Sequence, residues 1–367
     1  MLINYYPKYY ILDEIPGKYN SINLFIDLKN CMQPLYMGKN IELLVENTKV
    51  EGRIDSRIIT DILSFLAFHK IYSIKRNKTI NFFLFYETGR SFYHINIYKN
   101  YKMTRKIDAL NGLERKDREL FTIIIQKNLN LIEKILNYIP NIWVIKLENL
   151  EADFIPYYLI RNKLIPDGSN NINIIYSNDH DMFQNLILGN NIFQFIKIKN
   201  SKEILRPGEV NKKFLKKDTN IDDEFFPLIL SIIGDKSDNI SGIPGIGLSR
   251  VVDILEDIDI NNKISMDEIY TNIYKKNKLG FNLNTQNKIK IDEDIIVRNL
   301  KLISFEYLSR YLDDPPKTEF LERKKSIIKK MTEIPKKKAS LDAISEALSK
   351  SRIILENGNE IDILYHQ

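Results

Sequence analysis

The sequence predicts an α/β protein with a parallel sheet, followed by a helical domain and a basic tail. Up to about residue 217, short apolar segments rich in β-branched residues alternate with segments of helical period. Such alternation is typical of a parallel sheet with helices between its strands. Beyond that point the strand-like segments stop, and a glycine-rich turn joins two helical segments.

Five short, apolar, β-branched segments are expected to be strands: 22–28, 79–87, 141–147, 172–177 and 191–199. The last of them alternates apolar and polar residues, which predicts an edge or half-exposed strand. Helices are expected at 54–70, at 117–138 and after residue 151, where Pro156 falls in the first turns and is tolerated.

The second half of the chain is expected to be helical at 223–233, 248–256 and 292–312. The chain then divides into four parts: an N-terminal extension 1–20, an α/β domain 21–217, a helical domain 218–314 and a basic C-terminal tail 315–367. We expect the tail to add nonspecific affinity for a polyanion, with the docking of a partner protein as the alternative.

The composition limits the class of protein. The 367 residues carry a formal net charge of +6, which permits a polyanionic partner without requiring one. The single cysteine, Cys31, excludes an internal disulfide framework and favours a reducing compartment, so an intracellular protein is expected. No apolar run approaches the roughly 18 residues of a membrane span, and the start lacks the layout of a secretion signal.

Acids follow the predicted strands at the points where the strands end: Asp27, Glu87, Glu151, Asp153, Asp179 and Asp181. The carboxyl ends of parallel strands meet at one edge of a sheet, where ligands bind. Carboxylates gathered there repel one another unless cations lie among them, and Mg²⁺ prefers oxygen ligands. Two such ions about 4 Å apart suit phosphodiester hydrolysis. Each acid alone is more simply a helix cap, but the set at equivalent positions is not.

The stretch SIIGDKSDNISGIPGIGLSR, residues 231–250, concentrates glycines beside acids. Glycine lets backbone amides approach a phosphate closely because no Cβ intervenes. A tight connection between helices is the alternative. Asp235 and Asp238, which could reach the same metal centre, favour the functional interpretation.

These segments resemble the motifs of the 5′ nuclease superfamily, which includes flap endonucleases, bacteriophage 5′–3′ exonucleases and the nuclease domain of bacterial DNA polymerase I. The resemblance covers roughly residues 20–312 and is strongest in GDKSDNISGIPGIG, which is similar to the family's helix–three-turn–helix motif. NLFIDLKN, EADF and YSNDHDMFQNL resemble its metal-binding segments. NIYKNYKMTRK resembles its arch segment, and IIVRNLKLISF its closing helix.

The resemblance implies a PIN-like parallel twisted sheet with flanking helices, a helical arch near 92–120 and a helix–three-turn–helix domain. It implies a Mg²⁺-dependent 5′–3′ exonuclease or flap endonuclease that cuts branched or 5′-ended DNA by a two-metal mechanism in DNA replication or repair. The first ion would be held by Asp27, Glu87, Glu151 and Asp153. The second would be held or approached by Asp179, Asp181 and Asp235, with Asp238 nearby.

Further assignments follow from the same resemblance. Mn²⁺ would substitute for Mg²⁺, and backbone carbonyls of the helix–three-turn–helix would bind K⁺. Lys102 and Arg105 would contact the phosphate that is cut. DNA would be held by Gly242, Gly245, Gly247, Ser249 and Arg250. The expected partners are DNA with 5′ flaps, nicks, gaps or 5′ ends, and replication proteins at the tail remain the alternative to its nonspecific affinity. We expect a monomer, in the cytoplasm of a bacterial host if the protein is phage-encoded.

Three residues depart from the family pattern. Glu87 stands where aspartate is usual, and its extra methylene moves the carboxylate by roughly 1.5 Å. Phe154 stands where phage members often carry aspartate, and Leu28 where glycine is usual. Two alternatives remain, a non-catalytic relative that binds branched DNA and a nuclease that removes RNA primers. The aspartates after the third and fourth strands are all retained, which favours an enzyme over a binder.

Overall fold

The computed structural model describes residues 19–29, 56–103, 126, 128–136, 139–165, 170–198, 201–244, 246–256 and 294–313. Several predictions lie outside these residues: Cys31, Arg105, Gly245, the side chain of Arg250, the arch beyond residue 103 and the tail 315–367. No helix in the part that the structure describes is long and apolar enough to cross a membrane.

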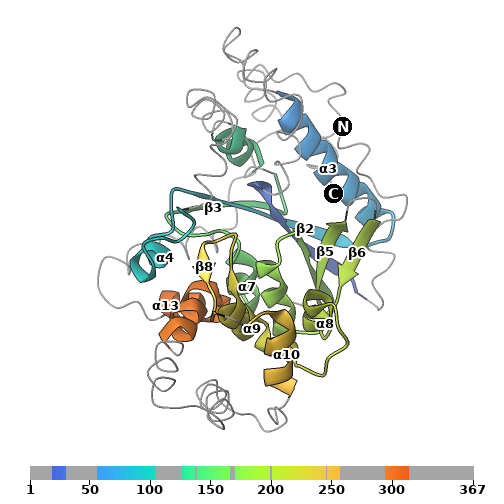
Figure 1. The fold of residues 1–367 in the computed structure, drawn as a ribbon. Helices are drawn as coiled ribbons and strands as arrows, with labels where there is room; N and C mark the ends of the chain where they lie inside the picture. Colours follow the sequence, from blue (N-terminus) through green and yellow to red (C-terminus); the bar gives the residue numbers. More distant parts are fainter. Residues whose placement is uncertain are drawn as a thin grey trace, which may run out of the picture.

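A six-stranded sheet forms the centre of the fold (Figure 1). Its order is β3 (Ile142–Glu148), β2 (Thr79–Thr88), β1 (Ser21–Asp27), β4 (Asn171–Tyr176), β5 (Ile192–Ile198) and β6 (Ser201–Leu205). The first five strands run parallel, as predicted, and β6 is antiparallel to β5. The prediction that 191–199 is an edge or half-exposed strand is wrong, because β6 covers that edge and residues 192–196 are all buried. The sequence SKEIL of β6 is too polar and too short to give a strand signal.

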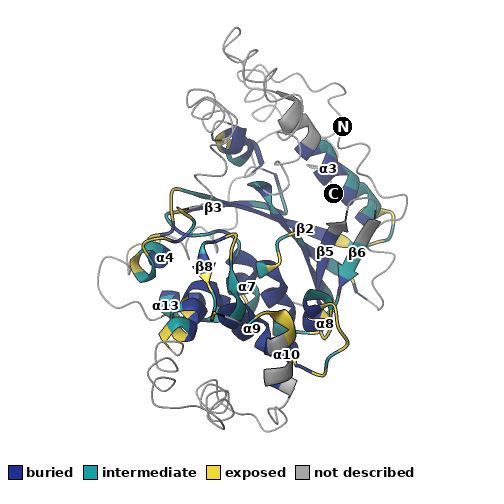
Figure 2. Cartoon of the chain, in the orientation of Figure 1, coloured by how far each residue is buried: buried dark blue, intermediate teal, exposed yellow. Residues whose placement is uncertain are grey.

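Both faces of the sheet are buried, and each covers its own core (Figure 2). One face, which includes Leu24 and Leu84, packs against α3 (Ser56–Ile74) and the helical residues 128–136. The other face carries Phe25 and Phe83, and it packs against α7 (Ile155–Arg161) and α13 (Phe305–Asp313). Because side chains alternate along a strand, Asp27 and Glu87 extend this second face.

A row of buried asparagines crosses the middle of the sheet on that second face. Asn81 Nδ2 donates to Asn23 Oδ1 at 2.9 Å, and Asn23 Nδ2 donates to Asn173 Oδ1 at 3.0 Å. The three residues are direct neighbours in the register of β2, β1 and β4. A slip of one residue would break both bonds and turn Asp27 to the opposite face, so the row helps to fix where the acids lie.

The remaining elements follow the sheet in the chain: α8 (Val210–Leu215), the 3-10 helix η4 (Asp223–Phe225), α9 (Phe226–Ile233) and α10 (Leu248–Glu256). A short hairpin of β7 (Gly234–Asp235) and β8 (Ile240–Ser241) leads from α9 toward α10. The helices predicted at 223–233 and 248–256 are thereby confirmed.

The single helix predicted at 292–312 is wrong, because the described residues form two helices, 294–303 and α13, with Ser304 between them. The side-chain amide of Gln184 explains the break. It donates to Ile303 O at 2.9 Å and accepts from Phe305 N at 2.9 Å. These bonds replace helical ones, and a side chain so distant in sequence gives no local signal.

Candidate metal centre

Two glycines close the β7–β8 hairpin by direct backbone contact. Gly234 has a φ of +78°, and a Cβ there would lie 2.3 Å from Gly242 N. A Cβ at Gly242 would lie 2.2 Å from the carbonyl of Ile233. Neither position accepts a side chain, so both glycines are required by packing inside the turn. Asn299 secures the hairpin, since its Nδ2 donates to Ser231 O and Ser241 O, each at 2.8 Å.

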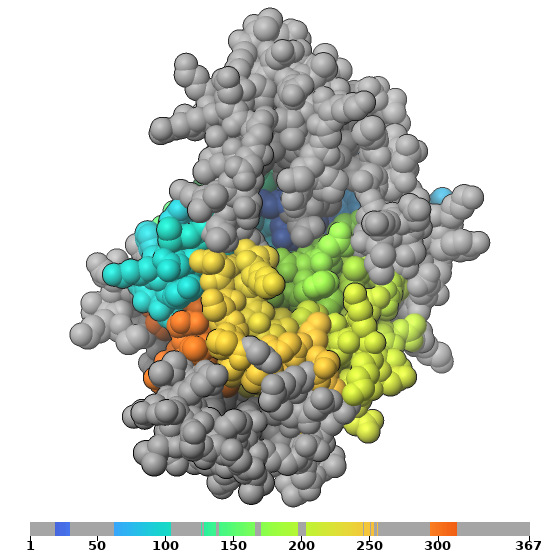
Figure 3. Space-filling model, in the orientation of Figure 1, coloured from blue at the N-terminus to red at the C-terminus, as the bar shows by residue number. Residues whose placement is uncertain are grey.

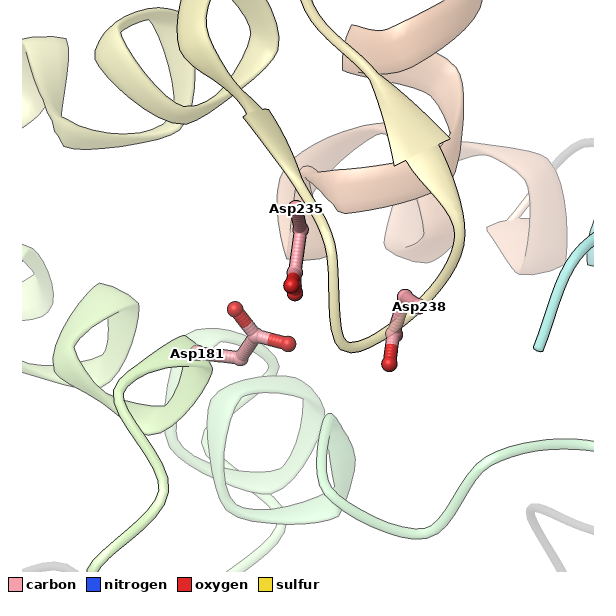
Figure 4. Close-up of side chains that lie close together, drawn as sticks. All are labelled: Asp181, Asp235 and Asp238. Carbon is pink, nitrogen blue, oxygen red and sulfur yellow. The ribbon is translucent and has the colours of Figure 1, made fainter. Parts of the chain in front are cut away.

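The hairpin presents two aspartates to a third, Asp181, which lies in the segment that follows β4. Oxygens of Asp181, Asp235 and Asp238 all lie within 4.8 Å of one another. Figure 4 shows Asp181 at the start of the 3-10 helix η3 (Asp181–Leu188), facing the other two across the turn. Asp179 Oδ1 accepts from Asp181 N at 3.1 Å, which fixes the start of η3. In Figure 3 the yellow segment that contains the hairpin adjoins the cyan segment that ends at residue 103.

Burial and like charge both act on the carboxyls in and beside this cluster. Burial raises the pKa of Asp181 well above its usual range, and the negative charges of Asp179 and Asp238 raise it further. Burial also raises the pKa of Asp153, and Glu151 adds to the effect. Carboxylates with raised pKa values become fully ionised when a cation binds among them. Their oxygen donors suit a hard divalent ion such as Mg²⁺, so the residues present fit a metal centre.

Lys102 lies at the edge of the cluster and opposes its charge. Its Nζ lies 2.5 Å from Glu151 Oε1 and 3.4 Å from Asp238 Oδ2. Burial acts to raise the pKa of Glu151, but Lys102, His94 and the Tyr101 hydroxyl together lower it to about 2, with Lys102 contributing most. Lys102 has a φ of +53°, and its N–H donates to Asp238 O at 2.9 Å. This backbone conformation joins the segment after α4 (Phe92–Ile97) directly to the hairpin.

Comparison with solved structures identifies the architecture. A bacteriophage T5 flap endonuclease, solved as a pseudo-enzyme–product complex with DNA and metal ions, matches 85% of this chain and 100% of its own at a TM-score of 0.58 and 17% identity. The T5 5′-exonuclease with bound zinc ions matches 84% and 99% at a TM-score of 0.56 and 16% identity. The chain has the 5′ nuclease fold. No family model and no curated protein sequence matches it.

Within this 5′ nuclease fold, none of the four acids predicted for the first metal ion belongs to the cluster, although Glu151 and Asp153 line the small cavity beside it. Of the acids that the structure describes, Asp27 ends β1, while Glu87 near the end of β2 forms an ion pair with Lys29 at 2.6 Å. The cluster within 4.8 Å includes neither of them. The metal-binding roles of all four acids stay predictions. Lys29 was missed by sequence reasoning, although the period of a strand extended past Asp27 puts it on the same face.

The residues predicted to bind DNA divide into two groups in the part of the 5′ nuclease fold that is described. Gly242 is needed for contact with the backbone of α9 and the hairpin, so packing is sufficient to explain a glycine there, and its role in DNA binding stays a prediction. A Cβ at Gly247 would meet nothing within 4 Å, and Ser249 is exposed at the start of α10. These two positions can therefore be reached from outside. Their role in DNA binding stays a prediction.

Tyr101 is a site residue that sequence reasoning missed. It is buried, and its hydroxyl lies 2.9 Å from both Glu151 Oε2 and Asp238 Oδ2. The signal was present, because Tyr101 directly precedes Lys102 in the YKMTR segment that resembles the arch motif. Tyr101 thus bridges the end of β3 and the hairpin, which are far apart in the sequence.

Proposed function

We propose that this protein is a divalent-metal-dependent, structure-specific 5′ nuclease that hydrolyses phosphodiester bonds in branched or 5′-ended DNA. One observation carries the proposal. Asp181, Asp235 and Asp238 converge within 4.8 Å in a 5′ nuclease fold, and Lys102 lies at the edge of that cluster. Burial and neighbouring carboxylates raise the pKa values of Asp181 and Asp153, and a cation bound among these acids would relieve that repulsion.

The reaction follows from the chemistry of the groups. A water oxygen forms a bond to phosphorus, the bond from phosphorus to the 3′ oxygen breaks, and a 5′-phosphate and a 3′-hydroxyl result. Two divalent ions, Mg²⁺ or Mn²⁺ in its place, would supply the activation of water and the stabilisation of charge. Glu151 and Asp153 would hold one ion, and Asp181 with Asp235 the other. Lys102 donates to Glu151 in the protein alone, and it would donate to a non-bridging phosphate oxygen in the complex.

DNA would be held by its backbone rather than by its base sequence. The open side of Gly247 and the exposed Ser249 would receive the phosphates of the duplex, with K⁺ at the carbonyls of the same turn. The T5 flap endonuclease was solved with DNA and metal ions, which supports DNA as the ligand. We place the protein, as a monomer, in DNA replication or repair.

A cleavage assay tests the function. Labelled flap, nicked, gapped and 5′-tailed DNA, together with an RNA–DNA hybrid, are incubated with the protein with and without Mg²⁺. We expect Mg²⁺-dependent cuts near the branch point, and Asp181→Asn should abolish them while branched-DNA binding persists. Binding of branched DNA without cleavage in Mg²⁺ or Mn²⁺ would instead identify a non-catalytic relative.

A further inference from the structure

A buried histidine supports the bridge between Glu151 and Asp238. The His94 ring is stacked on the Tyr101 ring, with centroids 4.6 Å apart and planes within 13°. His94 is only 4% exposed, and Tyr101 is 7% exposed. The two stacked rings together line one side of the acidic cluster. Among the residues that line the small cavity at the acidic cluster are both rings, Glu151 and Asp238.

Both nitrogens of the His94 ring are held. Nε2 lies 3.0 Å from Leu302 O, and because a carbonyl oxygen only accepts, Nε2 is the donor. Nδ1 lies 2.6 Å from Ser91 Oγ, the N-cap of α4. The neutral ring satisfies both contacts, with Nδ1 accepting from the serine hydroxyl. The plane of the ring is therefore set by two elements, the start of α4 and the helix 294–303.

The Tyr101 hydroxyl can act only if its ring is fixed. It lies 2.9 Å from one oxygen of Glu151 and 2.9 Å from one oxygen of Asp238. Nothing in these two contacts sets the tilt of the ring, whereas the stacked His94 does. Groups that hydrogen-bond to carboxylate ligands orient them and tune their affinity for metal.

We propose that His94 is a positioning residue for the metal centre, which holds Tyr101 so that its hydroxyl keeps Glu151 and Asp238 at a fixed separation. The assignment rests on the proposed function, in which these two acids hold or approach metal. The role of His94, holding the Tyr101 ring in place, differs from the roles assigned to the acids, Lys102 and the glycine turn. It also couples the helix 294–303, through Leu302, to the geometry of the acids.

A double-mutant cycle tests the proposal. Wild type, His94→Ala, Tyr101→Phe and the double variant are compared by Mg²⁺ titration calorimetry of the DNA-free protein and by single-turnover cleavage. His94→Ala should weaken Mg²⁺ binding and slow cleavage about tenfold or more. The Tyr101→Phe background keeps the stacked ring but lacks the hydroxyl. There, His94→Ala should reduce Mg²⁺ affinity and the cleavage rate by less than about twofold.

A second variant and a control exclude a general loss of stability. His94→Phe keeps a flat ring but loses both hydrogen bonds. It should therefore reduce Mg²⁺ affinity and the cleavage rate less than His94→Ala does. This reduction should also vanish in the Tyr101→Phe background. The control is His69→Ala, which removes another buried histidine, 5% exposed and packed on Phe65 on the opposite face of the sheet. Melting temperatures are recorded for all variants.

The outcomes separate the two ideas. Equal losses in both Tyr101 backgrounds, or a loss of Mg²⁺ affinity as large in His69→Ala, would overturn the positioning role. A wild-type protein that binds Mg²⁺ but cuts no DNA would overturn the proposed function. The calorimetric cycle would still decide the role of His94, because it does not depend on cleavage.

Discussion

Replacing Lys102 by alanine should change three measurable quantities in a set pattern. In the protein alone, Lys102 neutralises Glu151 at 2.5 Å and lies 3.4 Å from Asp238. In the complex it would instead face the phosphate that is cut. Its removal should therefore slow cleavage, strengthen the binding of Mg²⁺ to the DNA-free protein, and destabilise the metal-free fold.

The size of the rate effect follows from the position of Nζ. A unit charge about 4 Å from a phosphate oxygen contributes on the order of 4 kcal/mol at an effective dielectric constant of about 20. The Lys102 side chain is 26% exposed, and solvent screens part of this energy. About 3 kcal/mol remains, which is typical of one well-placed donor, so the single-turnover rate should fall about a hundredfold.

Removal of Lys102 should lower the stability of the metal-free protein and strengthen its binding of Mg²⁺. Without Lys102, Glu151 loses the group that contributes most to lowering its pKa, and its side chain is only 14% exposed. An ionised and partly buried carboxylate left without its partner lowers the melting temperature at neutral pH. Added Mg²⁺ should restore stability more fully in the variant than in the wild type, since no lysine competes for Glu151.

The assays are single-turnover cleavage, DNA binding in Ca²⁺, and thermal melting with and without Mg²⁺. The matched control is Lys146→Ala, which removes a lysine 3.3 Å from Glu148 at the end of β3. It should leave the cleavage rate unchanged. A folded Lys102→Ala protein with an unchanged single-turnover rate and weakened DNA binding would refute the assigned role and reduce Lys102 to a general electrostatic contact.

Three further outcomes are expected. The double variant Asp179→Asn/Asp181→Asn should lose cleavage while keeping affinity for branched DNA, and full activity in an assay with Mg²⁺ would contradict a metal role for these acids. Gly247→Val should fold and bind duplex DNA more weakly, because its Cβ points into open space, whereas Gly242→Val should lower the melting temperature because its Cβ meets backbone at 2.2 Å. The affinity for DNA, measured by titration at several salt concentrations, should fall by about 0.9 log units per neutralised phosphate for each log unit of salt. A DNA affinity that does not change with salt concentration would contradict binding through the phosphates.

The parts of the site that follow from topology were predictable from the sequence. Parallel strands end at one edge, and the acids that follow β3 and β4, Glu151, Asp153 and Asp181, do line one cavity with the hairpin aspartates. Asp27 and Glu87 are not among the residues that line it. The parts that depend on long-range pairing were not. Gln184 breaks the last long helix from 119 residues away, and the His94 ring binds a carbonyl 208 residues away. Local periodicity contains no information about either contact.

Glycines show the same division. The sequence marks the turn at 234–247 as one that needs close approach, but not what approaches. At Gly242 the answer is the backbone of the chain itself, at 2.2 Å. At Gly247 no atom of the described chain lies within 4 Å of a Cβ, which leaves room for an external group. The same residue type thus serves packing at one position and access at another.

The distribution of charge indicates where cations would be needed most. Lys29 and Lys102 each hold one glutamate of the carboxyl edge, Glu87 and Glu151. Lys102 also acts to lower the pKa values of Asp153 and Asp181, yet burial and neighbouring carboxylates keep both well raised. The lysines therefore do not neutralise this part of the site, and the remaining demand for positive charge lies between the end of β3 and the hairpin. A divalent ion bound there would relieve the repulsion among the aspartates and free Lys102 for a phosphate.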